Sequence, residues 1–183
     1  MACNLSKGRN EVCKDSIGGL AGVYFLNYTT SSFTKNADGE VTAFPSGSTV
    51  YYYQLKGTSA YTETVNTSRE NGTTFFSQEL VLNLKKLTNE MTTQMKLMAY
   101  GRPQIVVHTM NGDALLVGEE EGADVTAGTI QTGAGMGDLY GYSITFTGQE
   151  RLPAAFISGS TISNPFAALA GNGLPTIVYG TNS

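Results

Sequence analysis

The chain has 183 residues, enough for one domain with its own hydrophobic core, and only 14% of them are charged, against about a quarter in typical globular proteins. A formal net charge of −4 argues against a nucleic-acid-binding protein, which needs a basic surface, but is compatible with an acidic wall that DNA slides past. No apolar run has the length of a signal peptide core or a membrane span, so we expect neither export nor membrane insertion.

The first part of the chain is predicted to form an arm and a pair of strands. Residues 1–20 lack a regular pattern and are expected to be an N-terminal arm. Residues 23–28 are mostly aromatic or β-branched, which is typical of a buried strand. After a polar turn, residues 41–44 are predicted to return as the partner of that strand and to end at Pro45.

Three longer segments are predicted to form a β-meander. Residues 49–56 and 61–70 alternate in the manner of strands, and residues 76–85 carry their large side chains at every second position. Asn71-Gly72 predicts a tight hairpin turn between the last two segments, because both residues tolerate positive φ.

One helix is predicted over residues 88–100. Thr88 is suited to cap its start, while Gly101 and Pro103 are suited to end it. An apolar stripe at helical spacing is expected to face the core, and it consists of Leu87, Met91, Met95 and Met98.

The following segments are predicted to be a hairpin, a loop and a long last strand. Residues 104–110 and 114–118 form two short strands around Asn111-Gly112. Residues 126–138 are glycine-rich and are expected to be a loop. Residues 139–148 are predicted to be the final strand, with core anchors at Leu139, Ile144 and Phe146.

Together these elements indicate a mainly β protein, an antiparallel β-sandwich or barrel over residues 21–152 with one flanking α-helix. The remaining residues 153–183 are apolar but are interrupted by three prolines, so this extension cannot build a core alone. Two alternatives stay open for it. It folds back onto its own domain, or it packs on a neighbouring subunit through Phe156, Ile157, Phe166 and Leu169.

The sequence lacks the groups of common catalytic sites, and we expect no enzyme, metal or cofactor. His108 is the single histidine and lies in a predicted strand, which is typical of a packed or surface histidine. Residues 133–138 superficially resemble a nucleotide loop, but the spacing is wrong and a strand follows, so a flexible loop is the simpler interpretation. Cys3 and Cys13 are too few for a disulfide scaffold, which leaves inert buried thiols, a local disulfide or a functional role.

Glu119, Glu120 and Glu121 form an acidic run. Adjacent side chains on an extended chain point to opposite faces, so a converging carboxylate pair is not expected and a solvated turn is the simple interpretation. In a ring of identical subunits, however, one such turn per subunit becomes a ring of negative charge, and these residues are therefore the candidate lining of a channel.

The order of elements over residues 20–150 resembles the tail tube proteins of bacteriophages, a fold shared with the inner tubes of contractile injection systems. Several short motifs of this chain are also similar to motifs in virion proteins of phages that infect Bacteroidetes-type hosts. These motifs are Cys3, Gly8, Cys13-Lys14-Asp15, Gly18-Gly19, Val23-Tyr24-Phe25, Asn111-Gly112, Gly118, Gly137-Asp138 and Gly141-Tyr142.

This resemblance implies a virion structural protein, a tail tube or tail ring subunit assembled in the host cytoplasm, whose rings, expected to be hexameric, stack into a conduit for DNA ejection. Its implied partners are copies of itself, other tail or connector proteins, and passing DNA without sequence-specific binding; the family brings no catalytic residues. The alternatives are a head–tail connector or decoration protein and, in another class, a carbohydrate-binding β-sandwich adhesin that uses Tyr51, Tyr52 and Tyr53.

Overall fold

The computed structural model describes residues 7–10 and 13–180. One sheet consists of β1 (Leu20–Leu26), β4 (Thr49–Gln54), β7 (Gln104–Thr109), β8 (Ala114–Val117), β11 (Ala155–Phe156) and β12 (Thr176–Tyr179). The other consists of β5 (Ala60–Ser68), β6 (Thr73–Lys85), β9 (Asp124–Gln131) and β10 (Gly141–Glu150). A hairpin of β2 (Thr34–Lys35) and β3 (Val41–Ala43), the helix α1 (Asn89–Tyr100) and the 3-10 turn η1 (Gly171–Gly173) complete the elements.

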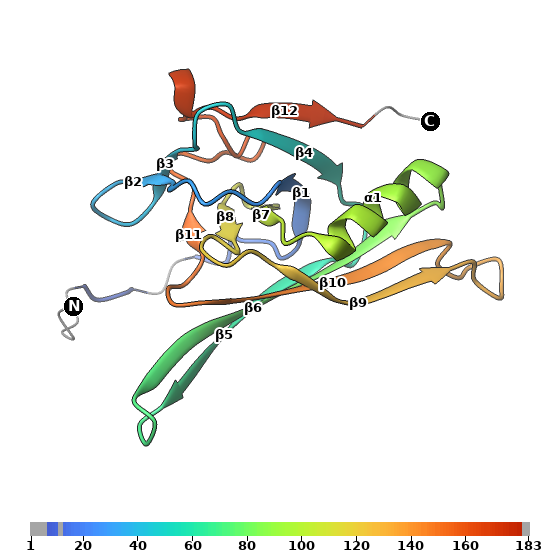
Figure 1. Ribbon diagram of the computed structural model, residues 1–183, viewed down its shortest axis with the longest axis horizontal. Helices are drawn as coiled ribbons and strands as arrows, with labels where there is room; N and C mark the ends of the chain where they lie inside the picture. Colours follow the sequence, from blue (N-terminus) through green and yellow to red (C-terminus); the bar gives the residue numbers. More distant parts are fainter. Residues whose placement is uncertain (1–6, 11–12, 181–183) are drawn as a thin grey trace.

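The six-stranded sheet has the order β11-β8-β7-β1-β4-β12, and the four-stranded sheet has the order β5-β6-β10-β9 (Figure 1). All strand pairs in the two sheets are antiparallel except β12 with β4. The predicted mainly β sandwich with one helix is confirmed.

The six-stranded sheet is buried on both faces, and β1 at its centre shows why. Val23 and Phe25 point into a core shared with the four-stranded sheet and α1. Tyr24 and Leu26 point into a second core, which the segment after β10 and the residues around β2 and β3 cover. A strand buried on both sides needs a continuous apolar run, which is what the sequence of β1 provides.

The C-terminal segment belongs to this second core. Strand β11 pairs with β8, and β12 adds in parallel to β4 at the edge of the six-stranded sheet. Ile157, Phe166 and Leu169 are buried there. Of the two alternatives for this segment, the structure therefore has the one in which it folds back onto its own domain.

Two predicted strand pairings are wrong. Residues 41–43 pair with β2 instead of β1, which lies between β4 and β7. The segment 49–54 also does not continue into β5 and β6 as a meander, because the chain crosses from one sheet to the other between β4 and β5. Alternation along a segment predicts a strand and its buried face, but it carries no information about the partner.

The predicted loop at residues 126–138 is also wrong in its first half, because residues 124–131 form the edge strand β9. Its pattern is weak because most of its side chains are exposed and Gly128 is the residue over which Met95 of α1 lies. The β6–β5 hairpin and the β7–β8 hairpin were both predicted, and Gly72 and Gly112 have the positive φ expected of their turns.

The helix begins as predicted, since the Thr88 hydroxyl accepts a hydrogen bond from the Met91 backbone N–H at 3.1 Å. Gly101 ends it, but with a φ of −97° and not in the left-handed conformation. The methionine stripe is only partly buried, and it packs against the first core.

Candidate assembly surface and acidic turn

The four-stranded sheet has two free edges. Within the described residues, β5 pairs only with β6 and β9 only with β10, so one edge of each strand has no partner. Strand β5 carries one charged residue, Glu63, in nine residues, and β9 carries one, Asp124, in eight. Neither contains proline. Native proteins usually protect exposed edges with charges, proline or short strands, so long unprotected edges indicate strands that pair with another chain.

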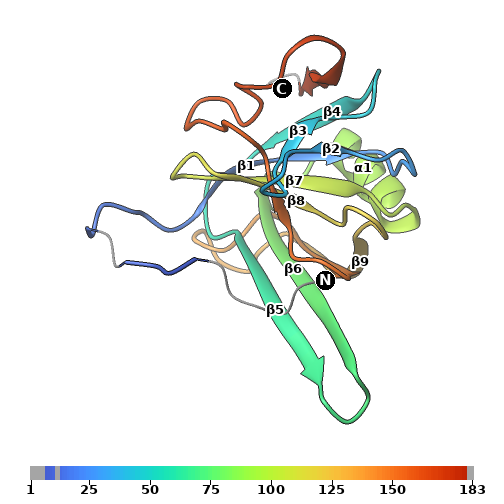
Figure 2. The ribbon, with the colours of Figure 1, turned by 90° about the vertical axis from the view of Figure 1, so that its left-hand side faces the viewer.

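The hairpin of β5 and β6 projects beyond the body of the protein in both views (Figure 1 and Figure 2). Residues 64–77 of this hairpin are called the arm below, and within them residues 66–75 lie beyond the last pair of β6 with β10. Two apolar side chains of the arm are exposed: Val65 at 58% and Phe75 at 37%. An isolated two-stranded hairpin is marginally stable in water, so an arm of this kind gains stability from contacts with a partner.

The face of the four-stranded sheet that points away from the core is polar and carries few charges. One row across the four strands consists of Thr62, Glu79, Thr147 and Asp124, and a second consists of Thr64, Ser77 and Gln149. Thr126 and Thr147 hydrogen-bond through their hydroxyls at 2.9 Å on the same face. Hydroxyl and amide side chains therefore form most of this surface.

Backbone and side-chain contacts hold the acidic turn, residues 119–121, in place from several sides. The Glu119 carboxylate is 2.7 Å from Lys35 Nζ, and the Glu119 carbonyl accepts a hydrogen bond from Gln104 at 2.8 Å. The Glu120 carbonyl accepts one from the Tyr28 hydroxyl at 2.8 Å. The turn is therefore attached to three other parts of the fold. Of its three predicted channel-lining side chains, only Glu120 and Glu121 are exposed, while Glu119 is half-buried.

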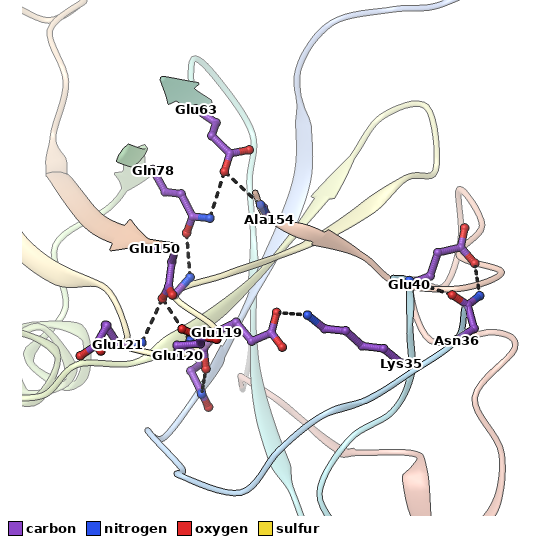
Figure 3. A network of polar contacts seen from close by, with 12 residues as sticks. Lys35, Asn36, Glu40, Glu63, Gln78, Glu119, Glu120, Glu121, Glu150 and Ala154 are labelled. Carbon is purple, nitrogen blue, oxygen red and sulfur yellow. Dashed lines mark hydrogen bonds and ion pairs between the residues drawn. The ribbon is translucent and has the colours of Figure 1, made fainter. Parts of the chain in front are cut away.

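Two buried side chains connect the turn to the four-stranded sheet (Figure 3). Glu150, the last residue of β10, accepts hydrogen bonds from the backbone N–H groups of Glu120 and Glu121 at 3.1 and 3.0 Å through one oxygen, Oε1. Gln78 on β6 accepts one from the N–H of Gly118 at 2.9 Å. Both side chains continue the inward-facing positions of their strands, so the sheet itself presents polar groups to the turn.

A third residue extends this network to the root of the arm. Oε1 of Glu63 on β5 accepts hydrogen bonds from the Gln78 side-chain amide at 3.1 Å and from the backbone N–H of Ala154 at 3.0 Å. Figure 3 shows Gln78 between Glu63 and the turn. The arm, the acidic turn and the start of the C-terminal segment are therefore connected by one chain of hydrogen bonds.

The environment of Glu150 is unfavourable for its charge. Burial raises the pKa of its carboxyl, the two backbone N–H groups lower it, and the nearby carboxylates of Glu120 and Glu119 raise it again, with a net pKa above the ordinary value. Sequence reasoning missed Glu63, Gln78 and Glu150. The available signal was a polar residue at an inward position of an otherwise apolar run, Gln78 before Leu80 and Leu82, and Glu150 after Ile144 and Phe146.

The predicted inter-subunit residues lie in two different environments. Phe156 is 50% exposed on β11, whereas Ile157, Phe166 and Leu169 are buried in the second core of the same chain and have no surface to offer a neighbour. They are therefore assigned to the core here, and only Phe156 remains available for a contact between subunits.

Other candidate residues do not form a site. His108 is buried, with Nε2 2.8 Å from the Thr161 carbonyl, so it fixes the C-terminal segment to β7. Tyr51 and Tyr53 lie on the opposite face of β4 from Tyr52, so the three rings do not make the sugar platform of an adhesin. In the 133–138 loop, Asp138 accepts hydrogen bonds from the N–H groups of Ala134 and Gly135, which lower its pKa.

Cys13 is exposed, so the interpretation as a buried thiol is wrong for this residue, and Cys3 lies outside the described residues. Among residues 7–10 and 13–180, no group of three or more His, Cys, Asp or Glu side chains is arranged to hold a metal ion. In the same part of the chain, no helix is long and apolar enough to cross a membrane.

Comparison of the chain with family models, with curated proteins and with solved structures gives no significant match.

Proposed function

We propose that this protein is a structural subunit that assembles with copies of itself into closed rings, and that stacked rings form the conduit for DNA in a bacteriophage tail. The observation that carries the proposal is the pair of long, nearly uncharged free edges, β5 and β9, at opposite margins of one sheet. An interface between two different edges is heterologous, and such an interface generates a ring when its rotation closes.

The strand directions support this mode of assembly. All neighbours in the order β5-β6-β10-β9 are antiparallel, so β5 and β9 run in opposite directions. When copies are placed side by side with the same orientation, β5 of one copy meets β9 of the next in an antiparallel pair. The sheet then continues from copy to copy without a break in its hydrogen-bond pattern.

The surface that would face the bore is the polar face of the four-stranded sheet. Threonine, serine and glutamine side chains on it do not attract phosphates, and its row with Glu79 and Asp124 carries negative charge that repels them. Glu121 borders this face, in a shallow groove that Asp124, Thr126 and Thr147 line together with one cation, Arg102. Within this proposal Glu121 is the best candidate among the three acidic-turn residues for the channel lining, while the Glu119 carboxylate is paired with Lys35.

In this proposal the arm reaches a neighbouring copy or another tail or connector protein, the subunits assemble in the host cytoplasm, and the mature protein is located in the virion tail. DNA passes through the bore without sequence-specific binding, and the rings are expected to be hexameric.

The experiment compares assembly of the wild type with that of Thr64→Lys on β5 and Thr129→Lys on β9, using light scattering and negative-stain electron microscopy. A lysine on an edge strand opposes pairing with another chain. Thr145→Lys on the central strand β10 is the matched control, because it adds the same charge to the same face away from the edges. We expect rings or tubes for the wild type and the control, and folded monomers for the edge variants.

A wild type that remains monomeric at high concentration would contradict the proposed function. Edge variants that assemble like the wild type would show that the rings close through other surfaces.

A further inference from the structure

Glu150 occupies an unusual position at the end of a strand. It continues the inward-facing row of Tyr142, Ile144 and Phe146, and only 4% of its surface is exposed. Its oxygen Oε1 accepts the hydrogen bonds of two backbone N–H groups in the acidic turn, those of Glu120 and Glu121. These two bonds attach the turn to the end of the sheet, and both depend on this single oxygen.

The charged groups around Glu150 are mostly of its own sign. The turn contributes the carboxylates of Glu119 and Glu120, and β5 contributes Glu63 beyond Gln78. Lys35 of β2 is the cation paired with the turn, and its ion pair is with Glu119. Gln78 of β6 is neutral, and it is occupied by Gly118 and Glu63.

We propose that Glu150 is a proton-sensitive clasp for the acidic turn: the protonated carboxyl holds residues 119–121 against the end of the four-stranded sheet, and its ionisation loosens them. The proton enters from solvent onto Oε2, so that Oε1 remains the acceptor for both backbone N–H groups. On ionisation the proton returns to solvent, and the buried charge gains hydration only if the turn moves away.

The physical reason lies in the balance between burial and hydrogen bonding. Two N–H groups favour the ionised carboxylate, but burial and the repulsion by Glu120 and Glu119 outweigh them, so the pKa of Glu150 is raised in the closed arrangement. When the turn opens, Glu150 is hydrated and its pKa returns toward the ordinary value. Opening and ionisation therefore favour each other.

The clasp also reaches the arm. Gly118, which directly precedes the turn, is hydrogen-bonded to Gln78, and Gln78 to Glu63 at the root of the arm. If the turn moves away, Gln78 loses its hydrogen bond with Gly118. Gln78 and Glu63, at the root of the arm, are then held less firmly. This inference goes beyond the proposed function and does not depend on it, since the clasp operates within a single chain.

The test is an NMR titration of the isolated chain under dilute conditions in which it is monomeric. We expect the Glu150 carboxyl carbon to titrate at a pH above the ordinary glutamate pKa, with the amide signals of Glu120 and Glu121 following the Glu150 midpoint. Exchange of these two amides, corrected for its intrinsic pH dependence, should rise about tenfold per pH unit between the pKa of the open and of the closed arrangement.

Matched variants separate the clasp from a general charge effect. Glu120→Gln removes a carboxylate that raises the pKa of Glu150 and should shift the midpoint down, whereas Glu121→Gln, which removes a charge from the same turn, should leave it in place. Glu150→Gln should keep the turn closed and abolish the pH-dependent exchange. A Glu150 midpoint at or below the ordinary glutamate pKa would overturn the clasp, and so would amide signals of Glu120 and Glu121 that do not change with the ionisation of Glu150. Failure of the wild type to form rings would overturn only the proposed function.

Discussion

Phe166 provides a direct test of how the C-terminal segment is bound. Its side chain is 1% exposed and makes edge contacts with the rings of Tyr24 and Phe44, at centroid distances of 5.1 and 5.4 Å. Phe166→Ala removes this ring from the middle of the second core. Large-to-small substitutions of a fully buried phenylalanine cost about 3–5 kcal/mol, because the transfer free energy of the ring is lost and a cavity remains.

A loss of this size is a large share of the total stability of a domain, which is about 5–15 kcal/mol. The assay is urea unfolding followed at several protein concentrations. Phe156→Ala is the matched control, because the same residue type ten positions earlier is 50% exposed on β11 and should cost only about 1–2 kcal/mol.

The reasoning is refuted if the two variants lose the same stability. It is also refuted if the destabilisation by Phe166→Ala appears only at concentrations at which the wild type assembles, since the ring would then be anchored on a neighbouring copy. A loss that is larger for Phe166→Ala and independent of concentration is the expected result.

Three further predictions concern the C-terminal segment, the helix and the buried carboxylate. Deletion of residues 153–183 removes β11, β12 and four buried residues of the second core, so we expect the chain to lose its cooperative unfolding transition in circular dichroism, and a truncated chain that still melts cooperatively would contradict this. Met95→Asp places a charge on the side of α1 that packs against the first core and should cost about 1–3 kcal/mol in thermal unfolding, whereas Thr93→Asp on the exposed side should have little effect. The stability of the wild type should fall as the pH rises from the ordinary glutamate pKa to the raised pKa of folded Glu150, because the unfolded chain then binds fewer protons than the folded one. Below this pH window the contribution of Glu150 to the free energy of unfolding should be fully present. Glu150→Gln should remove that slope from urea titrations at a series of pH values, and an unchanged slope would assign it to another group.

Most single elements could be predicted from the sequence because their signals are local. The N-cap at Thr88 and the turn at Asn71-Gly72 depend on residues within a few positions, and the structure has both. The apolar run of β1 predicted a buried strand for the same reason, since apolar side chains on both faces of a strand have to be buried by other parts of the protein.

The pairing of strands was not decided by local signals. Residues 41–43 and 49–54 are both strands, but which neighbours they take depends on the two cores that form on either side of β1. Strand β9 was missed because its exposed side chains and Gly128 give no period of two, and its place as an edge follows from pairing with β10.

The sequence by itself determined that this is a mainly β chain with one helix, low charge and an acidic turn at residues 119–121, because composition and periodicity depend only on the order of residues. Only the tertiary structure decided that Phe166 is covered by its own domain and that Glu63, Gln78 and Glu150 support that turn. Phe166 meets Tyr24 across 142 positions of the chain, and Glu63 meets Ala154 across 91 (166 − 24 and 154 − 63). Contacts over such separations arise from the packing of whole elements. The free energy of burial and of hydrogen bonding depends on a residue's neighbours in space and not on its neighbours in sequence.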